Sequence, residues 1–482
     1  ERLTNLGLSY LSLDRAGSTL SNGELQRVQI SRAVRSDTTG VLYVLDEPSI
    51  GLHPYNVDGL MKIVRELVDR KNSVVLVDHD PRILMDADQL IEIGPGAGKE
   101  GGRIVTQGTP LEAEKNPHSL IGPYLSGKES LKVRSRATEK DMFENGSIRI
   151  KTKPFYTVKA LDVSIPKGRM IAVTGVSGSG KTSLVIECLV PALQAVIQGT
   201  KLPEHVDSIE AKGIQSVKVI DSKPIGANVR STVATYDGVF DDLRKLFART
   251  ADAKAKGLTA GDFSYNTGKL RCPVCDGTGI ITMDVQFLPD VDTICPSCGG
   301  SRYGKDAYDI LWKSKEKDSV SVSLPGLLKL TVEEAAGILH EETKIAKQLK
   351  ILQDLGVCYL TLGEATPALS GGEAQRLKLA YEMETPQQGS VFVFDEPTIG
   401  LHPQDVKELV LIFDHLIQLG ATVIVIEHDL ELVTNCDYII DMGPWGGTEG
   451  GRVVVEGTPE AVAATSESIT GRYLKQELAE DK

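Results

Sequence analysis

Eight consecutive residues, from Gly175 to Thr182, have the types and the spacing of a phosphate-binding loop. They match the pattern G-x-x-x-x-G-K-[ST] at every fixed position. Glycines let backbone N–H groups close around phosphate oxygens, and the N-terminus of the helix that follows adds the positive end of its dipole. We expect Lys181 to reach the β- and γ-phosphates of a nucleotide and the Thr182 hydroxyl to bind Mg²⁺. The predicted contacts are Gly175, Ser177, Gly178, Ser179, Gly180, Lys181, Thr182 and Ser183.

Four of the seven cysteines form two C-x-x-C pairs, Cys272 with Cys275 and Cys295 with Cys298, and 19 residues separate the pairs. Paired knuckles at this spacing are typical of a structural Zn²⁺ site, in which four thiolates bind the metal tetrahedrally and leave no open position. Redox chemistry of a C-x-x-C pair is the alternative. The other cysteines stand alone, which indicates a reducing compartment rather than a disulfide framework, and we expect a cytoplasmic protein.

Acidic and histidine residues recur at a constant distance along the chain. Asp46-Glu47 recurs as Asp395-Glu396, and His79 recurs as His428, so that both are offset by 349 positions (395 − 46 and 428 − 79). A run of the form Leu-Ser-x-Gly-Glu begins at position 20 and again at position 369, with the same offset. An offset this constant indicates two copies of one fold, each with the same chemical groups in the same order.

The residues around these groups predict the elements that position them. Ile171–Thr174 is predicted as a buried strand before the phosphate loop, and 183–189 as a helix after it. Val41–Leu45 and Val391–Phe394 are predicted as strands that end at the Asp-Glu pairs, and a later strand in each copy ends at the histidine. Alternating strands and helices imply a mostly parallel α/β sheet, with the chemistry at the carboxyl ends of its strands.

The repeated residues resemble those of an ATP-binding cassette (ABC) ATPase. The resemblance implies that Leu-Ser-x-Gly-Glu is the ABC signature, and that its ATP contacts are Ser21, Gly23, Ser370, Gly371 and Gly372. It implies Walker B aspartates for Mg²⁺ at Asp46 and Asp395. The carboxylates that polarise the attacking water would be Glu47 and Glu396, and the histidines that sense the γ-phosphate would be His79 and His428.

The first copy has no matching phosphate loop in this sequence. Subtracting the offset from the loop position gives 175 − 349 = −174, which is before residue 1. The chain also lacks an initiator methionine, so we expect it to be part of a longer protein.

The predicted fold class is α/β, with twin ABC-type cassettes and a zinc-binding insertion. The linker between the cassettes is polar and basic, and we expect it to be solvated. The predicted segments are 1–125 for the C-terminal part of the first cassette, 126–146 for the linker, 147–190 and 351–482 for the second cassette, and 191–350 for an insertion with signature-domain helices and a zinc module at about 263–305.

Several further motifs are similar to the UvrA family, whose members belong to the excinuclease of nucleotide excision repair. The similarity covers nearly the whole chain, as roughly the later half to two-thirds of such a protein. The motifs are Arg230-Ser231, Ala234-Thr-Tyr236, Gly238-Val-Phe240, Phe263-Ser-Tyr-Asn266, Phe287-Leu-Pro-Asp290, Arg302-Tyr303 and the Gly-rich runs 94–102 and 443–451.

Four positions depart from the family pattern. Asn22 stands where the signature usually has Gly, and Ser222, a predicted nucleotide-site residue, stands where a Mg²⁺-sensing Gln is usual. Thr182-Ser183 reverses the commoner Ser-Thr, and Asp78 precedes the first histidine where Glu is usual. These departures resemble a class II UvrA paralogue.

The net charge of −13 requires any DNA partner to meet a local basic surface. The family resemblance implies such a partner, double-stranded DNA that is distorted or damaged, recognised by shape. Basic residues of the predicted insertion are the candidates for phosphate contacts: Arg230, Arg244, Lys245, Arg249, Lys254, Lys256, Lys269, Arg271, Arg302 and Lys305.

The resulting prediction is an ATP-dependent, DNA-binding protein that senses distorted duplex, with ATP, Mg²⁺ and Zn²⁺ as ligands. The resemblance implies a homodimer and, in a longer chain, a region that binds the excinuclease component UvrB. No nuclease activity and no membrane segment are expected from this sequence. Two alternatives stay open: a paralogue that serves drug tolerance or self-resistance without excision, and a transporter-type ABC ATPase, against which the zinc insertion argues.

Overall fold

The computed structural model of the chain describes residues 3, 6–8, 10–17, 22–33, 38–96, 101–127, 129, 133–221, 223, 225–226, 228–283, 291–314, 320–383 and 387–480. Contacts divide the chain into two units, one made of Glu1–Ser222 with Pro386–Lys482 and the other of Lys223–Thr385. In the described ranges, no helix is long and apolar enough to cross a membrane. Ser21, Ser222 and the Phe287-Leu-Pro-Asp290 motif lie outside the described residues.

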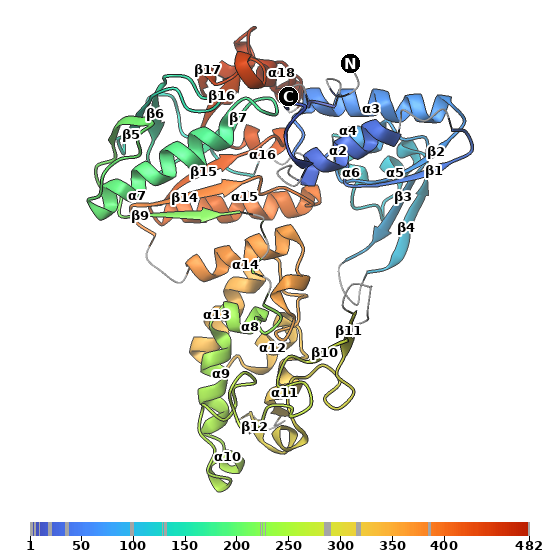
Figure 1. The fold of residues 1–482 in the computed structure, drawn as a ribbon, viewed down its shortest axis with the longest axis vertical. Coiled ribbons are helices and arrows are strands. Elements are labelled where there is room, and N and C mark those ends of the chain that lie inside the picture. The colour runs from blue at the N-terminus through green and yellow to red at the C-terminus, as the bar shows by residue number, and fades with distance from the viewer. Residues whose placement is uncertain are drawn as a thin grey trace. The chain divides into compact units, whose positions relative to one another are not determined.

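A six-stranded sheet forms the centre of the second copy (Figure 1). In spatial order its strands are β17 (Arg452–Gly457), β16 (Tyr438–Gly443), β7 (Met170–Thr174), β15 (Thr422–Ile426), β14 (Ser390–Asp395) and β9 (Ser216–Ile220). β17 is antiparallel to β16, whereas the other neighbours are parallel. The strands predicted beside the phosphate loop and the Asp-Glu pair are β7 and β14, and the predicted α/β class is confirmed.

Helices and a second sheet cover the central sheet. The helix predicted after the phosphate loop is a π-helix, η3 (Ser183–Leu189), that continues as α7 (Val190–Gln198). Leu184 and Leu193 pack in one apolar cluster with Val391 and Ile424 of the central sheet. Strands β6 (Asp162–Pro166), β5 (Ser147–Thr152) and β8 (Val206–Glu210) form an antiparallel sheet, and the other helices are α15 (Pro403–Gln418), α16 (Leu430–Thr434), η6 (Gly447–Glu449), α17 (Pro459–Ala464) and α18 (Ile469–Glu480).

The first copy repeats this order of elements. Its helices and strands are α2 (Asn22–Ala33), β1 (Leu42–Asp46), α3 (Pro54–Asp69), β2 (Ser73–Val77), α4 (Pro81–Met85), β3 (Leu90–Gly94), β4 (Arg103–Gly108), α5 (Pro110–Lys115) and α6 (Gly122–Leu125). β1 pairs with β2 in parallel, and β3 pairs with β4 in an antiparallel arrangement.

The two copies differ in the middle of the sheet. Within the described ranges no strand lies between β2 and β3, the place that β7 holds between β15 and β16 in the second copy. Apolar side chains of the first copy are therefore left uncovered, with Leu42 at 61 %, Val44 at 63 % and Ile93 at 70 % exposure. All residues of β15 and β16 are buried. The described sheet of the second copy is therefore buried on both faces, whereas strands of the first copy expose apolar side chains.

The predicted linker is not simply solvated. The side chain of Arg134 is only 5 % exposed, and it forms ion pairs with Asp414 (2.9 Å) and Asp437 (3.1 Å). Arg134 also donates to the backbone carbonyl of Asn435 at 2.8 Å, and the backbone N–H of Ala137 donates to Asp437. The ion pairs and hydrogen bonds of Arg134 hold the segment against the second copy, so the prediction of a solvated linker fails at Arg134. Residues 135, 138–141, 143, 144 and 145 are exposed, as predicted.

The second unit is mainly helical and also contains the cysteine pairs. Its elements are α8 (Val233–Tyr236), α9 (Val239–Ala248), α10 (Ala251–Ala255), β10 (Ile280–Met283), β11 (Val291–Ile294), η4 (Lys305–Asp309), β12 (Leu311–Lys313), β13 (Ser321–Ser323), α11 (Leu324–Leu327), α12 (Val332–Ile338), α13 (Thr343–Asp354), η5 (Thr366–Ala368) and α14 (Gly371–Met383).

The unit boundary differs from the predicted insertion of 191–350. The second unit is Lys223–Thr385. Residues before it belong to the first unit because α7 continues the loop helix and β8 and β9 pair with strands of the second copy. Residues 351–385, which include the second signature helix α14, lie in the second unit.

We predict that Arg134→Met lowers the free energy of unfolding by about 3 kcal/mol, because the Asp437 carboxylate stays buried without its cation. Arg136→Met is the matched control. Arg136 pairs with Glu460, whose side chain is 58 % exposed, so its loss should cost less than about 1 kcal/mol. Urea unfolding curves of the two variants give the comparison, and equal effects would contradict a clamping role for Arg134.

Candidate functional site

The phosphate loop follows β7, and its backbone carbonyls accept hydrogen bonds from its own Lys181. Gly175 has φ 130°, and a Cβ there would lie 2.0 Å from the carbonyl oxygen of Met442, so only glycine fits. Lys181 Nζ donates to the carbonyls of Gly175 (2.9 Å) and Val176 (3.1 Å). Burial lowers the pKa of Lys181 to about 8. The ammonium is thus held inside the loop, where a phosphate group would offer it stronger acceptors.

Hydroxyls of the loop lack partners. Within the described part of the chain, the buried Oγ atoms of Ser177 and Ser179 have no hydrogen-bond partner. Thr182 is exposed and Ser183 is half-buried at the start of η3. Buried unpaired hydroxyls are rare in native proteins unless a ligand completes them, so the loop is suited to an oxygen-rich anion.

The acidic and histidine residues of the second copy meet beside this loop. Glu396 follows β14 in a left-handed conformation (φ 49°), and its Oε1 lies 3.7 Å from His428 Nε2. Burial and the neighbouring Asp395 raise the pKa of Glu396 to about 7. Burial, with repulsion from Lys181, lowers the pKa of His428 well below its usual value. A carboxyl with a pKa near neutrality next to a neutral imidazole is suited to accepting a proton from water.

Glu427 supports this pair and was missed by the sequence analysis. Its carboxylate accepts bonds from Thr398 N (3.2 Å) and Oγ1 (2.9 Å) and from the backbone N–H groups of His428 (2.7 Å) and Asp429 (3.2 Å). It thereby ties the loop after β14 to the loop after β15. The repeat carried the signal, since an acidic residue precedes each repeated histidine.

Asp78 performs the same task in the first copy. It accepts bonds from Ser49 N (3.3 Å) and Oγ (2.8 Å) and from the N–H groups of His79 (2.8 Å) and Asp80 (3.0 Å). The departure from Glu at this position therefore preserves the contacts. Glu47 has φ 45°, and its Oε1 lies 3.6 Å from His79 Nε2, a contact that raises the pKa of His79.

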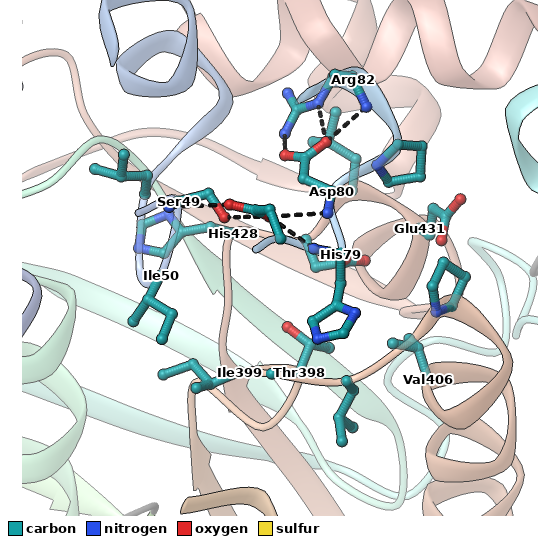
Figure 2. A pocket seen from close by; sticks show the side chains of 18 of the residues that line it. Ser49, Ile50, His79, Asp80, Arg82, Thr398, Ile399, Val406, His428 and Glu431 are labelled. Carbon is teal, nitrogen blue, oxygen red and sulfur yellow. Dashed lines mark hydrogen bonds and ion pairs between the residues drawn. The ribbon is translucent and has the colours of Figure 1, made fainter. Parts of the chain in front are cut away.

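Residues of both copies surround one cavity of about 390 Å³. Figure 2 shows matching residues around it, with Ser49, Ile50 and His79 from the first copy and Thr398, Ile399 and His428 from the second. Asp46 ends β1 as Asp395 ends β14, but Asp46 is exposed and Asp395 is half-buried. In the second copy, β7 lies in the same sheet as β14 and brings the phosphate loop beside Asp395.

The signature helix of the first copy lies close to the phosphate loop of the second. The ring of Tyr10 packs on Gly178, where a Cβ would lie 2.5 Å from the ring. Tyr10 donates to Glu24 at 2.6 Å. Arg27 is 4 % exposed, and its charge interacts with Glu396 of the other copy. In the described part of the chain, Nε and Nη1 of Arg27 have no hydrogen-bond partner.

The second signature belongs to the other unit. There Tyr359 donates to Glu373 at 2.7 Å, which repeats the Tyr10 contact of the first copy. Ser370 N donates to Glu373 Oε2 at 2.7 Å, and Glu373 N donates to Ser370 Oγ at 3.3 Å, a capping box that begins α14. Gly371 and Gly372 are its first residues. Gly23 is the second residue of α2, and Ser21 lies outside the described residues.

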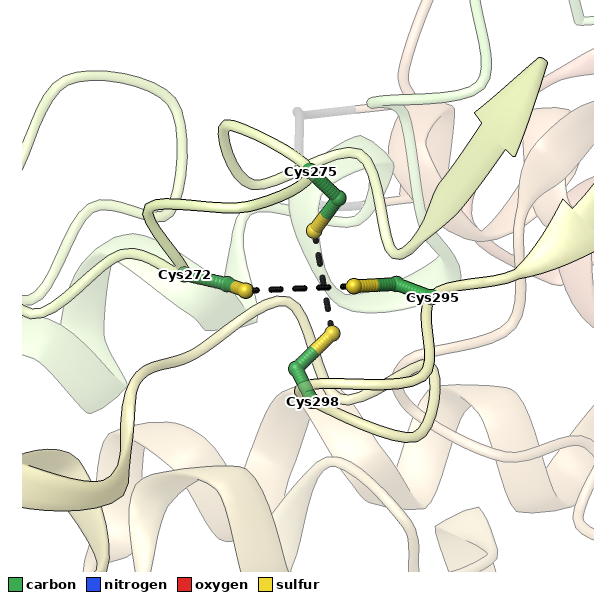
Figure 3. Close-up of side chains that lie close together, drawn as sticks. All are labelled: Cys272, Cys275, Cys295 and Cys298. Carbon is green, nitrogen blue, oxygen red and sulfur yellow. Dashed lines mark hydrogen bonds between the residues drawn. The ribbon is translucent and has the colours of Figure 1, made fainter. Parts of the chain in front are cut away.

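The four paired cysteines converge in the second unit, as Figure 3 shows. Cys272 and Cys295 Sγ are 4.0 Å apart, and Cys275 and Cys298 Sγ are 3.7 Å apart. Four sulfurs at about 2.3 Å from one Zn²⁺ are about 3.8 Å from each other in a tetrahedron. The spacing therefore fits a metal and is too long for disulfides. Gly279 N donates to Cys275 Sγ at 3.3 Å, as expected for a bound thiolate.

Most of the candidate DNA contacts are paired with acids. Arg271 lies 3.0 Å from Asp276, to which Arg230 also pairs at 3.5 Å. Arg244, Lys245, Lys256 and Lys269 pair with Asp241, Asp242, Asp309 and Asp262. Arg249, Lys254 and Lys305 are exposed. A uniformly positive surface does not form, because acids that are close in space offset most of these cations.

Arg302 is a correction to the predicted DNA contacts. It is 6 % exposed, donates to the carbonyl of Val229 at 2.8 Å and lies over the ring of Tyr265 at 5.2 Å. A guanidinium buried in this way cannot reach a phosphate, so Arg302 supports the knuckles instead.

We predict one Zn²⁺ per chain by elemental analysis. Cys275→Ala should abolish stoichiometric zinc, because a structural site contributes about 10–16 kcal/mol of apparent binding free energy through all four ligands. Cys358→Ala, at a cysteine outside the cluster, is the control and should retain the metal. Carefully purified protein without zinc would refute the assignment.

We predict that Glu396→Gln stabilises the ligand-free protein at pH 8 but not at pH 4. The folded pKa of Glu396 is raised to about 7, so the folded state holds the proton more tightly and wild-type stability falls as pH rises from the unfolded pKa through about 7. The gain at pH 8 should be about 1–3 kcal/mol. Urea unfolding at both pH values measures it, and an effect independent of pH would contradict the shifted carboxyl.

Comparison with known proteins gives close relatives. No family model matches the chain. It is 44 % identical to UvrABC system protein A of Staphylococcus aureus (strain COL) over 100 % of this chain and 50 % of the relative. It is also 44 % identical to UvrABC system protein A of Aquifex aeolicus (strain VF5), over 99 % of this chain and 51 % of the relative. The chain thus spans about half the length of the curated relatives it matches.

Solved structures agree with these relatives. The crystal structure of UvrA2 from Deinococcus radiodurans matches 99 % of this chain and 57 % of that chain, with TM-score 0.90 and 39 % identity. The archaeal ribosome recycling factor aABCE1 matches 99 % of this chain and 75 % of that chain at TM-score 0.52 and 17 % identity, which is a likeness of fold alone. The twin-cassette ABC fold predicted from the sequence is confirmed, and the chain belongs to the UvrA family.

Proposed function

We propose that this chain hydrolyses ATP at a site shared by its two copies and uses the nucleotide state to sense distorted or damaged duplex DNA in nucleotide excision repair. The observation that carries the proposal is the approach of Tyr10 and Arg27, from the first signature segment, to the phosphate loop and Glu396 of the second copy. ABC cassettes bind ATP between the phosphate loop of one cassette and the signature of another. The family relationship supports the DNA function.

The residues of the site divide the chemistry among them. Lys181 exchanges its two carbonyl acceptors for the β- and γ-phosphates, and the free hydroxyls of Ser177 and Ser179 line the same loop. Thr182 and Asp395 would hold Mg²⁺, which would offset phosphate charge. Glu396 orients and deprotonates the attacking water. His428, neutral at pH 7, offers a ring N–H to the γ-phosphate without a cation's desolvation cost.

The partners follow from the family and from the second unit. We propose that the zinc-bearing unit contributes to the duplex-binding surface, with Arg249, Lys254 and Lys305 as its exposed cations. A homodimer and the excinuclease component UvrB are the protein partners that a UvrA relative implies. We propose the cytoplasm as the place of action. A pull-down with UvrB, carried out on the full-length protein, separates the repair role from that of a drug-tolerance paralogue, which would not retain UvrB.

We predict that Ser21→Arg blocks single-turnover ATP hydrolysis at the Lys181 site, whereas Ser370→Arg spares it. A helix dipole acts only within its first turn, so the signature that matters is the one that lies against the loop. Lys181→Ala, which should not bind ATP, and Glu396→Gln, which should bind but hydrolyse about 10²–10⁴-fold more slowly, are the controls. Damage by Ser370→Arg with a silent Ser21→Arg would reverse the proposed pairing.

We predict duplex binding that weakens steeply with salt and favours a distorted duplex over an intact one, because each neutralised phosphate releases counterions. Arg249→Glu should weaken binding and lower the salt slope by about 1 or more. Lys201→Glu, at an exposed lysine of the first unit, is the control. Fluorescence anisotropy at about 50 and 200 mM salt measures both. Absence of binding at low salt would overturn the DNA role.

A further inference from the structure

A chain of buried hydrogen bonds runs from the first copy to the phosphate-loop strand of the second. His53 Nε2 lies 3.1 Å from Thr470 Oγ1, which donates to Asp441 Oδ1 at 2.6 Å. Thr174 Oγ1 donates to the same oxygen at 2.9 Å. His53, Thr470, Asp441 and Thr174 are each at most 2 % exposed, so water does not compete for these bonds.

The direction of the bonds is fixed by the backbone. Tyr55 N donates to His53 Nδ1 at 3.2 Å, so Nδ1 is the unprotonated ring nitrogen. Burial lowers the pKa of His53 well below its usual value and keeps the ring neutral. The Nε2 proton therefore points to Thr470, whose own proton goes to Asp441. Thr174 donates to Asp441 from the other side, so the bonds from His53 and from Thr174 both run toward the Asp441 carboxylate. The other tautomer of His53 would break the bond from Tyr55 N.

The two ends of this series of hydrogen bonds, His53 and Thr174, adjoin loops that carry candidate site residues. Thr174 is the last residue of β7 and immediately precedes Gly175 of the phosphate loop. Asp441 also interacts electrostatically with Lys181. At the other end, His53 is the N-cap of α3, directly after the loop that begins at Glu47. The hydrogen bonds thus connect the residue before the phosphate loop with the loop that carries Glu47.

The other half of the repeat lacks this connection. The counterpart of Thr470 is Ile121 (470 − 349), which has no hydroxyl, and the counterpart of Asp441 is Glu92 (441 − 349). Glu92 bonds to Ser119 Oγ at 2.5 Å and to the N–H groups of Leu120 and Ile121. His402 caps α15 as His53 caps α3, and its ring lies 5.9 Å from that of Tyr124, but the residue at the position of Thr470 has no hydroxyl. Among the described residues, this series of hydrogen bonds therefore occurs at only one of the two corresponding places in the repeat.

We propose that Thr470 is a positioning residue that transmits occupation of the Lys181 phosphate loop to the first copy's Glu47 loop, through Asp441 on one side and His53 on the other. The inference rests on the proposed nucleotide binding at Lys181 and adds to it a link between the two nucleotide sites. Coupling between sites requires a contiguous element that both ligands bias, and this hydrogen-bond chain is such an element.

The test is hydrogen exchange of the peptide that covers residues 49–57, with and without saturating Mg²⁺–AMP-PNP. In the wild type, nucleotide should slow exchange in this peptide. Thr470→Val keeps the shape of the side chain but loses its hydroxyl. It should reduce the nucleotide-induced slowing of exchange about fivefold, which corresponds to the free energy of one buried hydrogen bond. Thr470→Ser should restore it. AMP-PNP affinity, measured by displacement of a fluorescent nucleotide, should stay within about twofold in both variants.

Tyr473→Phe is the matched control. Tyr473 donates to Asp58 at 2.6 Å, so it joins the same two helices, α18 and α3, without touching Asp441. It should keep the nucleotide response. Equal loss in Tyr473→Phe and Thr470→Val, or a full response in Thr470→Val, would overturn the inference. If Thr470→Val does not fold, Thr470→Ala supplies the same comparison. A wild type that binds no AMP-PNP would instead refute the proposed function.

Discussion

Buried charges from both copies meet at one place in the first unit, and the arrangement around them depends on their mutual compensation. Lys181, Glu396 and Arg27 lie within electrostatic reach of each other, and burial acts against the charged form of each. In a medium of low dielectric constant, an ion is tolerated only beside its partners. The phosphate loop is therefore not a self-contained site, because its lysine is balanced by Asp395, Glu396 and Asp441 and its Gly178 packs against Tyr10 of the first copy.

Equal sequence motifs have unequal environments in the two copies. Asp395 sits at the end of a strand that is covered on both faces, whereas Asp46 ends a strand whose Leu42 and Val44 are exposed. The central strand β7 makes the difference, since it joins the two halves of the sheet and carries the loop that uses the aspartate. The central parallel strand β7 thus completes the apolar core and also carries the phosphate loop with Lys181.

The part of the second unit around the four paired cysteines has little apolar core. The apolar cluster there consists of the cysteines themselves with Ile281 packed against them, which is too little to hold four loop segments in place. Small modules of this kind need a metal or disulfides in addition to apolar burial. Arg302 and Tyr265 brace the knuckles from outside, and this explains why a cation predicted for DNA is buried. Four cysteines placed to bind Zn²⁺ and a buried cation–ring contact take the place of a conventional core.

The sequence alone determined the repeat, the α/β class, the cysteine cluster and the positions of the phosphate loop and the acidic pairs. These features are encoded by spacing within short segments, so local patterns suffice. Only the tertiary structure decided that Arg134 is buried against Asp437, that Glu427 ties two loops together and that His53 reaches Thr470. It also showed that acids offset the basic residues of the second unit. These contacts join residues that are distant in sequence, or depend on which side chains burial leaves unpaired, and no local pattern specifies either.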